Sequence, residues 1–177
     1  SVPTDCPGRE KAGWTGDILI YAETAMLNEE MTPFLSSWID GLCADQQTDG
    51  VIPLISPFTK LYETVGKQTM VPFGDTELTG IAGWSDAVIW VPYDMYTVTG
   101  NRDILRRTYT AMKKWCEYII KTARDKRGSD NPEDIDRYLW NTGFHFGEWL
   151  VPGRTGKGFE ICKESAFYIA PYFGFWS

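Results

Sequence analysis

A chain of 177 residues is long enough to form one domain with a sizeable hydrophobic core. Its net charge of −7 argues against nucleic acid as a partner, because binding phosphates requires basic surfaces. No stretch of about 18 apolar residues is present, so neither a membrane-spanning helix nor a membrane partner is expected.

Helical spacing of apolar residues dominates the first half of the chain. A first helix is predicted from Asp17, with an apolar face made of Ile18, Tyr21, Ala22, Ala25 and Met26. Thr32 is the predicted N-cap of a second helix, with Pro33 in its first position, which runs to about Gln46. Residues 48–83 are expected to form a long irregular loop with at most brief strand character at 51–55, and loops of this length are usually functional.

A third helix is predicted over 84–99, where Trp84 begins the apolar face and Pro92 is expected to produce a kink. Gly100 is expected to end this helix, and Asn101 to cap the next one. The apolar face of that fourth helix comprises Ile104, Leu105, Tyr109, Met112, Cys116, Ile119 and Ile120.

The last third of the chain is expected to be mostly loop over 125–158, with a short helix near 133–139 and another helix over 159–173. Helices joined by long loops predict an all-α fold, either a helical toroid or a solenoid of stacked hairpins. The sequence stops at 175–177 within an apolar helical pattern, which indicates a truncated domain.

The sequence offers little for metal or cofactor chemistry. Its four cysteines form no close pair, and His145 is the only histidine, so neither a metal site nor a histidine-based nucleophile is expected. Aromatic residues are 15% of the chain, which exceeds ordinary usage. Aromatic rings fill protein cores, and they also line sugar-binding clefts, where a ring face covers the C–H face of a pyranose.

The loop before the first helix concentrates groups that can perform glycoside hydrolysis, a reaction that needs one carboxylic acid and an opposing carboxylate. Glu10 is the candidate acid, and Trp14 could supply an apolar wall that raises its pKa, whereas Arg9 and Lys11 would lower it. Asp5 and Asp17 could accept hydrogen bonds from sugar hydroxyls.

A structural explanation stands beside this one. Asp17 could serve only as an N-cap or as a partner for the helix dipole. Arg9 could serve only to pair with Asp5, and a short acidic cluster alone is a weak signal.

The loop resembles the signature of bacterial α-L-rhamnosidases of glycoside hydrolase family 78, in the run DCPGREKAGWTGD at 5–17. Further segments match in the family's order: DGVIP at 49–53, GWSDA at 83–87, VPY at 91–93 with TGN at 99–101 and MKKW at 112–115, and FHFGEWL at 144–150. Five ordered matches are much more specific than any one of them.

The resemblance implies that 1–177 is the N-terminal part of a single (α/α)6 barrel that hydrolyses terminal α-L-rhamnosides with inversion, without metal or cofactor. Glu10 matches the general acid. The residues that match the surroundings of the sugar are Asp5, Arg9, Trp14, Asp17, Trp84, Asp86, His145 and Trp149. The family's general base is a glutamate on a later loop, beyond Ser177, so the 177 residues alone are expected to be inactive and to lack the remainder of their domain.

Three positions depart from the family's pattern: Gly8 replaces the common glutamine, Ser85 the usual glycine, and Glu148 the usual aspartate. Core packing is the alternative interpretation of Trp84, Trp149 and His145.

Two rival functions also remain. One is another toroidal carbohydrate enzyme, either a different glycosidase or a polysaccharide lyase, and the other is a non-catalytic module that binds glycans or a protein. A periplasmic or extracellular location is favoured over a cytoplasmic one.

Overall fold

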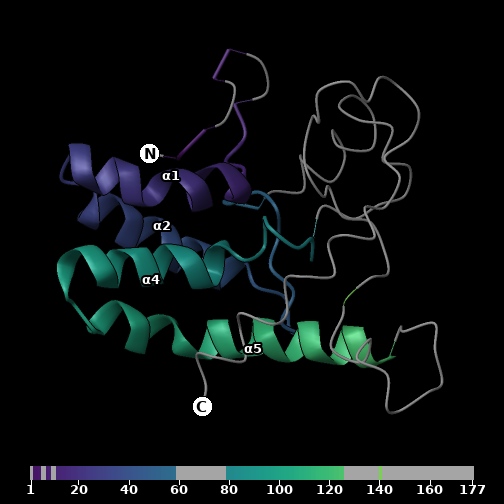
Figure 1. Ribbon diagram of the computed structural model, residues 1–177. Helices are drawn as coiled ribbons and strands as arrows, with labels where there is room; N and C mark the ends of the chain where they lie inside the picture. Colours follow the sequence, from purple (N-terminus) through teal and green to yellow (C-terminus); the bar gives the residue numbers. More distant parts are fainter. Residues whose placement is uncertain (1, 5–6, 9–10, 59–78, 126–139, 141–177) are drawn as a thin grey trace, which may run out of the picture. The chain divides into compact units, whose positions relative to one another are not determined.

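The computed structural model describes residues 2–4, 7–8, 11–58, 79–125 and 140. In this part of the chain it contains the helices α1 (Thr15–Asn28), α2 (Thr32–Asp45), α4 (Ala87–Thr99) and α5 (Asp103–Asp125) (Figure 1). No strand occurs among these residues, which make only two isolated antiparallel bridges, Trp14 with Ile55 and Pro53 with Thr79. The prediction of an all-α chain is therefore confirmed for the described part.

The chain divides into two compact units, Ser1–Trp115 and Cys116–Ser177. The first holds α1, α2, α4 and the beginning of α5. In the second, the ring of Tyr118 meets Trp140 edge-on, with 5.8 Å between the ring centroids. None of the helices in the described ranges is both long and apolar enough to cross a bilayer.

The first unit is built from helical hairpins. Residues 29–31 join α1 to α2, and residues 100–102 join α4 to α5 (Figure 1). α4 packs against both α1 and α2. The buried side of α1 includes Ala22 and Ala25, whose small side chains let a neighbouring helix approach closely. The opposing core residues of α4 are Val88, Val91, Pro92 and Met95.

The turn between α4 and α5 follows the sequence-based expectation. Gly100 adopts a left-handed conformation with φ of 70°, and its N–H donates to the carbonyl of Tyr96 at 2.7 Å. Asn101 then accepts a hydrogen bond from the N–H of Asp103 through its side chain, at 2.9 Å. The predicted helix end and the predicted cap are therefore both confirmed, and α4 continues through Pro92.

Three predicted helix starts are wrong by one to three residues. α1 begins at Thr15 rather than Asp17, because backbone hydrogen bonds to a neighbouring segment already order residues 13–15. Met31 is the N-cap of α2, and Thr32 lies inside the helix with its N–H donating to the Glu30 carboxylate at 3.1 Å. α4 begins at Ala87, because residues 82–86 form a turn.

Three residues predicted to face the core are exposed instead. Tyr21 is 55% exposed, Tyr109 48% and Ile120 43%. The buried stripe of each helix is narrower than the apolar pattern suggested, so residues at its edge remain in contact with solvent.

Candidate functional site

The candidate site lies at the N-terminal ends of α1 and α4, where two connecting segments also meet (Figure 1). The segment before α1 pairs with the segment after α2: Ser56 N–H donates to the Gly13 carbonyl at 2.9 Å, and Thr15 N–H donates to the Leu54 carbonyl at 2.8 Å. The Thr15 hydroxyl adds a buried hydrogen bond of 3.0 Å to the same Leu54 oxygen. These contacts fix Trp14, which lies between the two hydrogen-bonded residues.

Gly13 is a glycine because no other residue fits there. A Cβ atom at this position would lie 2.3 Å from the Ser56 carbonyl oxygen and 2.7 Å from a methyl group of Val2. The two backbones can approach this closely because position 13 carries no side chain.

The partner segment is anchored in turn on α5. Gly50 has a φ of 98°, and a Cβ atom there would lie 2.5 Å from the Lys114 carbonyl oxygen. The Gln46 side chain donates to the carbonyls of Gly50 and Ala111, at 2.9 and 3.0 Å. The run DGVIP at 49–53 begins in a turn, in which the Gly50 N–H donates to the Gln47 carbonyl at 3.0 Å, and it supports the loop that holds Trp14.

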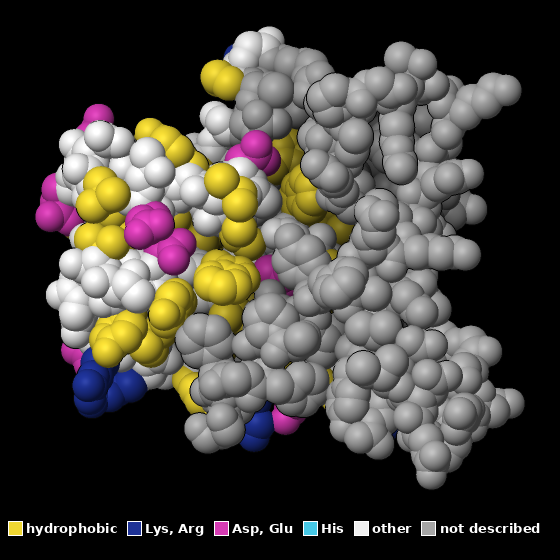
Figure 2. Space-filling model, viewed as in Figure 1, with side chains coloured by type: hydrophobic (Ala, Val, Ile, Leu, Met, Phe, Trp, Pro, Cys, Tyr) yellow, Lys and Arg dark blue, Asp and Glu magenta, His cyan; other side chains and the backbone are white. Residues whose placement is uncertain are grey.

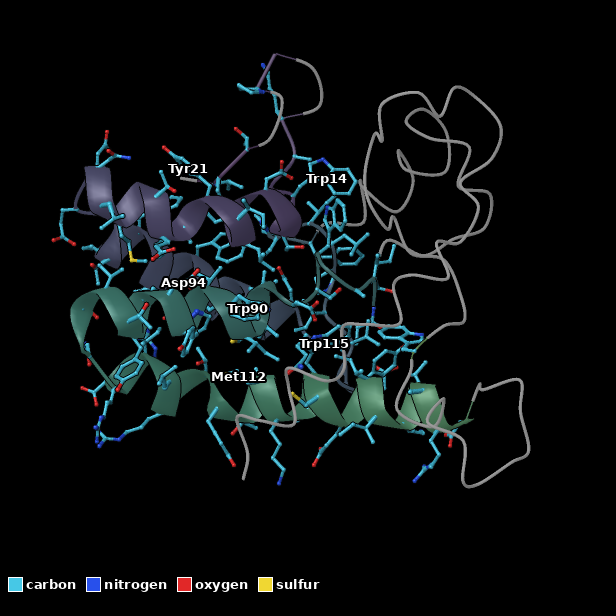
Figure 3. All side chains as sticks on the ribbon, viewed as in Figure 1. Trp14, Tyr21, Trp90, Asp94, Met112 and Trp115 are labelled. Atoms are coloured by element: carbon cyan, nitrogen blue, oxygen red, sulfur yellow. The ribbon has the colours of Figure 1, made fainter. Side chains whose placement is uncertain are left out.

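Trp14 occupies the N-cap position of α1 and is half-buried (Figure 3). Its indole Nε1 is buried and has no hydrogen-bond partner in the part of the chain that the structure describes. A buried donor without a partner costs about 1–3 kcal/mol. The indole therefore offers a polar group as well as the expected apolar ring.

Asp17 lies in the first turn of α1 and is exposed. The N-cap is Trp14, so the interpretation of Asp17 as the N-cap of this helix is wrong. A negative charge in the first turn still interacts favourably with the helix dipole.

Trp84 reaches the same place from a distant part of the sequence. Its half-buried indole lies directly over Gly16, where a Cβ atom would come within 2.7 Å of Nε1 and 2.8 Å of Cδ1 and Cε2. The structure therefore brings together the end of the matching run 5–17 and the run 83–87 at the first turn of α1. Gly16 is a site residue that sequence reasoning missed, because only the folded chain shows which ring covers it.

Asp86 is buried, with 1% exposure, and both of its carboxylate oxygens are engaged within the protein. Oδ2 accepts a hydrogen bond from the Gly83 N–H, and Oδ1 accepts one from Trp115 Nε1, each at 2.8 Å. Trp115 is a fully buried residue of α5, and its indole reaches the start of α4 (Figure 3). Contact of Asp86 with a sugar hydroxyl stays a prediction. Trp115 was also missed as a partner, although it lies in the matching run MKKW.

Ser85, which departs from the family's usual glycine, is fully buried. Its hydroxyl donates to the Ile52 carbonyl at 2.8 Å and accepts a hydrogen bond from the Ile81 N–H at 3.2 Å. The departure therefore adds a buried, satisfied contact.

The remaining predicted site residues, Asp5, Arg9, Glu10, His145 and Trp149, lie outside the described residues. Within the described ranges, no group of three or more His, Cys, Asp or Glu side chains could hold a metal ion.

Asp94 lies near the middle of α4, away from the N-terminal end that carries Trp84 (Figure 3). Burial raises its pKa to about 6, and the negative charge of Glu23 on α1 adds to the shift. Figure 2 shows acidic side chains between hydrophobic ones over α1 and α4. No sequence signal marked Asp94, because its shift depends on the packing of two helices.

The family model described as the bacterial alpha-L-rhamnosidase 6 hairpin glycosidase domain matches residues 1–170. An alpha-L-rhamnosidase of Formosa agariphila is 34% identical, over 97% of this chain and 19% of its own length.

Two solved structures are similar as well. The structure of a Streptomyces avermitilis alpha-L-rhamnosidase complexed with L-rhamnose has a TM-score of 0.64 and 31% identity, covering 84% of this chain and 12% of that one. The structure of an alpha-L-rhamnosidase from Dictyoglumus thermophilum, at 24% identity, shares the fold with a TM-score of 0.67 and covers 93% of this chain and 16% of that one. This chain thus spans less than a fifth of each of these proteins. The expected all-α fold, part of a six-hairpin toroid, is confirmed by these matches.

Proposed function

Because this chain belongs to the bacterial alpha-L-rhamnosidase six-hairpin glycosidase family, we propose that the protein containing it hydrolyses terminal α-L-rhamnosides with inversion. The observation that carries the proposal is the family match over residues 1–170, which includes the loop that bears Glu10. A relative of the same fold binds L-rhamnose in its crystal structure, which supports this sugar as the substrate.

In the proposed reaction, the Glu10 carboxyl donates its proton to the glycosidic oxygen as the bond to the anomeric carbon breaks. A second carboxylate removes a proton from a water molecule, whose oxygen attacks the anomeric carbon from the opposite face. Room for this water requires the two carboxyl groups to lie roughly 6.5–9.5 Å apart. The second carboxylate is assigned to a glutamate outside the 177 residues, so these residues alone are expected to have no activity.

The described residues that we assign to sugar binding lie near the N-terminal ends of α1 and α4. We assign the walls of the pocket to Trp14 and Trp84, which is supported by the packing of Trp84 on Gly16 beside the Trp14 loop. The buried Nε1 of Trp14 is a donor that a sugar oxygen or a neighbouring carboxylate could satisfy. Asp17, exposed in the first turn of α1, is assigned to a ring hydroxyl.

The remaining assignments rest on the family's motif. Asp5 and Arg9 are assigned to ring hydroxyls, and His145 and Trp149 to a further part of the sugar pocket. Asp86 is likewise assigned to a ring hydroxyl, with the Gly83 N–H and Trp115 Nε1, which donate to its two oxygens, holding the carboxylate in place.

The test is the substitution Glu10→Gln in the intact protein. Loss of the proton donor should lower kcat/KM strongly for rhamnosides with poor leaving groups and much less for activated aryl rhamnosides, whose leaving groups need little protonation. Glu29→Gln, at an exposed residue following α1, is the matched control and should leave both rates unchanged.

Equal rates for the wild type and Glu10→Gln on both substrates would remove Glu10 from the role of acid. Turnover of other aryl glycosides in preference to rhamnosides would favour a different toroidal carbohydrate enzyme. Sugar binding without any turnover by the intact protein would favour a non-catalytic module.

A further inference from the structure

The Ser85 side chain holds the turn that carries Trp84. The family's pattern has glycine at this position. The Ser85 hydroxyl donates to the Ile52 carbonyl and accepts from the Ile81 N–H, and the residue is fully buried. The Ser85 N–H also donates to the Ile81 carbonyl, at 3.0 Å. A glycine at position 85 could keep this backbone hydrogen bond, but it would lose both hydroxyl contacts.

The Ile52 carbonyl, which accepts from the Ser85 hydroxyl, belongs to the same segment that holds the Trp14 loop. Ile52 lies two residues before Leu54, whose carbonyl accepts from both the N–H and the hydroxyl of Thr15. The Gly80 N–H also donates to the Ile52 carbonyl, at 2.9 Å. The residues flanking Trp84 and those flanking Trp14 are therefore fastened to one short segment, 52–56.

The Trp84 indole also packs against the first turn of α1. The backbone of Gly16 lies against the ring, close enough that a Cβ atom would be 2.7 Å from Nε1. The position of the ring thus depends on two sets of contacts. The Ser85 hydrogen bonds hold the turn that carries the ring, and the first turn of α1 packs against the ring.

From this arrangement we infer that Ser85 is a positioning residue, which sets the distance between the Trp84 ring and the Trp14 loop and thereby tunes sugar affinity. The inference rests on the proposed function, since it assigns both rings to the rhamnose pocket. Ser85 touches no reacting atom, so it should act on substrate binding and leave the chemical step nearly unchanged. The departure from glycine is then an adjustment of the pocket.

The experiment compares Ser85→Ala and Ser85→Gly with the wild type in the intact protein, well below the temperature of unfolding. Loss of the buried hydroxyl and its two hydrogen bonds should raise KM for an aryl rhamnoside by about 3- to 10-fold, with kcat changed by less than about 2-fold. Ser37→Ala, at an exposed serine of α2, is the matched control and should change neither constant.

A second pair of variants separates positioning from mere stabilisation. In a Trp84→Phe background, Ser85→Ala should no longer raise KM, because two changes that act through one ring are not additive. Gly16→Ala, which displaces the ring from the opposite side, should raise KM in the same way without removing either hydroxyl contact.

A fall in melting temperature with an unchanged KM would overturn the inference, as would an effect of Ser85→Ala that persists in full without Trp84. If the wild type turns over no rhamnoside, the proposed function fails instead. The positioning of Trp84 is then read from near-ultraviolet circular dichroism: the spectral change caused by Ser85→Ala must vanish in Trp84→Phe, and its persistence would contradict the inference.

Discussion

Gly13→Ala is the substitution that most directly tests the support of the candidate site. The new methyl carbon would lie 2.3 Å from the Ser56 carbonyl oxygen, whereas Cβ atoms essentially never approach other atoms within 3.0 Å. The two backbone segments must therefore separate by about 1 Å at this point. This movement lengthens the 2.9 Å hydrogen bond from Ser56 to Gly13 and the 2.8 Å hydrogen bond from Thr15 to Leu54 beyond useful range.

The expected cost combines overpacking with the loss of these two backbone hydrogen bonds, and it amounts to about 2–5 kcal/mol. The assay is the midpoint of urea unfolding of the intact protein, followed by tryptophan fluorescence. Gly41→Ala is the matched control, because Gly41 is exposed within α2 and a Cβ atom there meets nothing within 4 Å. Alanine should stabilise that helix by about 0.5–1 kcal/mol. Equal midpoints for the two variants would refute the reasoning.

Two further predictions concern buried groups. Trp115→Phe removes the donor that lies 2.8 Å from Asp86 Oδ1, so it should destabilise the protein by about 1.5–3 kcal/mol, measured by urea unfolding. Asp94→Asn should raise the melting temperature at pH 7 and leave it nearly unchanged near pH 4. The pKa of Asp94 is about 6 in the folded protein against an ordinary value of 3.8, so the unfolded chain loses this proton first and stability falls as pH rises between these values. A pH profile of melting temperature identical for the wild type and Asp94→Asn would contradict this assignment.

Local features of the fold could be predicted from the sequence because nearby residues determine them. The end of α4 at Gly100 requires a left-handed residue, and the cap at Asn101 requires a short side chain with an acceptor, so both are visible in the sequence. The order of the helices follows from the spacing of apolar residues. The start of α4 was not visible, because Trp84 continues the apolar pattern while its backbone belongs to a turn.

Contacts between distant segments could not be predicted in this way. The hydrogen bond from Trp115 to Asp86 joins residues 29 positions apart, and nothing local to either residue marks the other as its partner. The same holds for Ser85 and Ile52, 33 positions apart. Motif matching identified Trp84 and Asp86 as residues of one segment, but only the fold distinguishes a ring that covers Gly16 from a carboxylate enclosed by donors.

The residues that shape this end of the molecule are largely ones without reactive groups. Segment 50–56 forms backbone hydrogen bonds with residues 13–15 and with Gly80, and its Ile52 carbonyl also accepts from the Ser85 hydroxyl. At positions 13, 16 and 50 a side chain would collide with a neighbour. Backbone contacts of this kind hold in place the loop that carries Trp14 and leads into the first turn of α1. It follows that substitutions at these glycines should impair the site as severely as changes to the groups that bind the sugar. Ser85 is the position at which the junction can be adjusted, because its hydroxyl adds contacts without displacing the backbone.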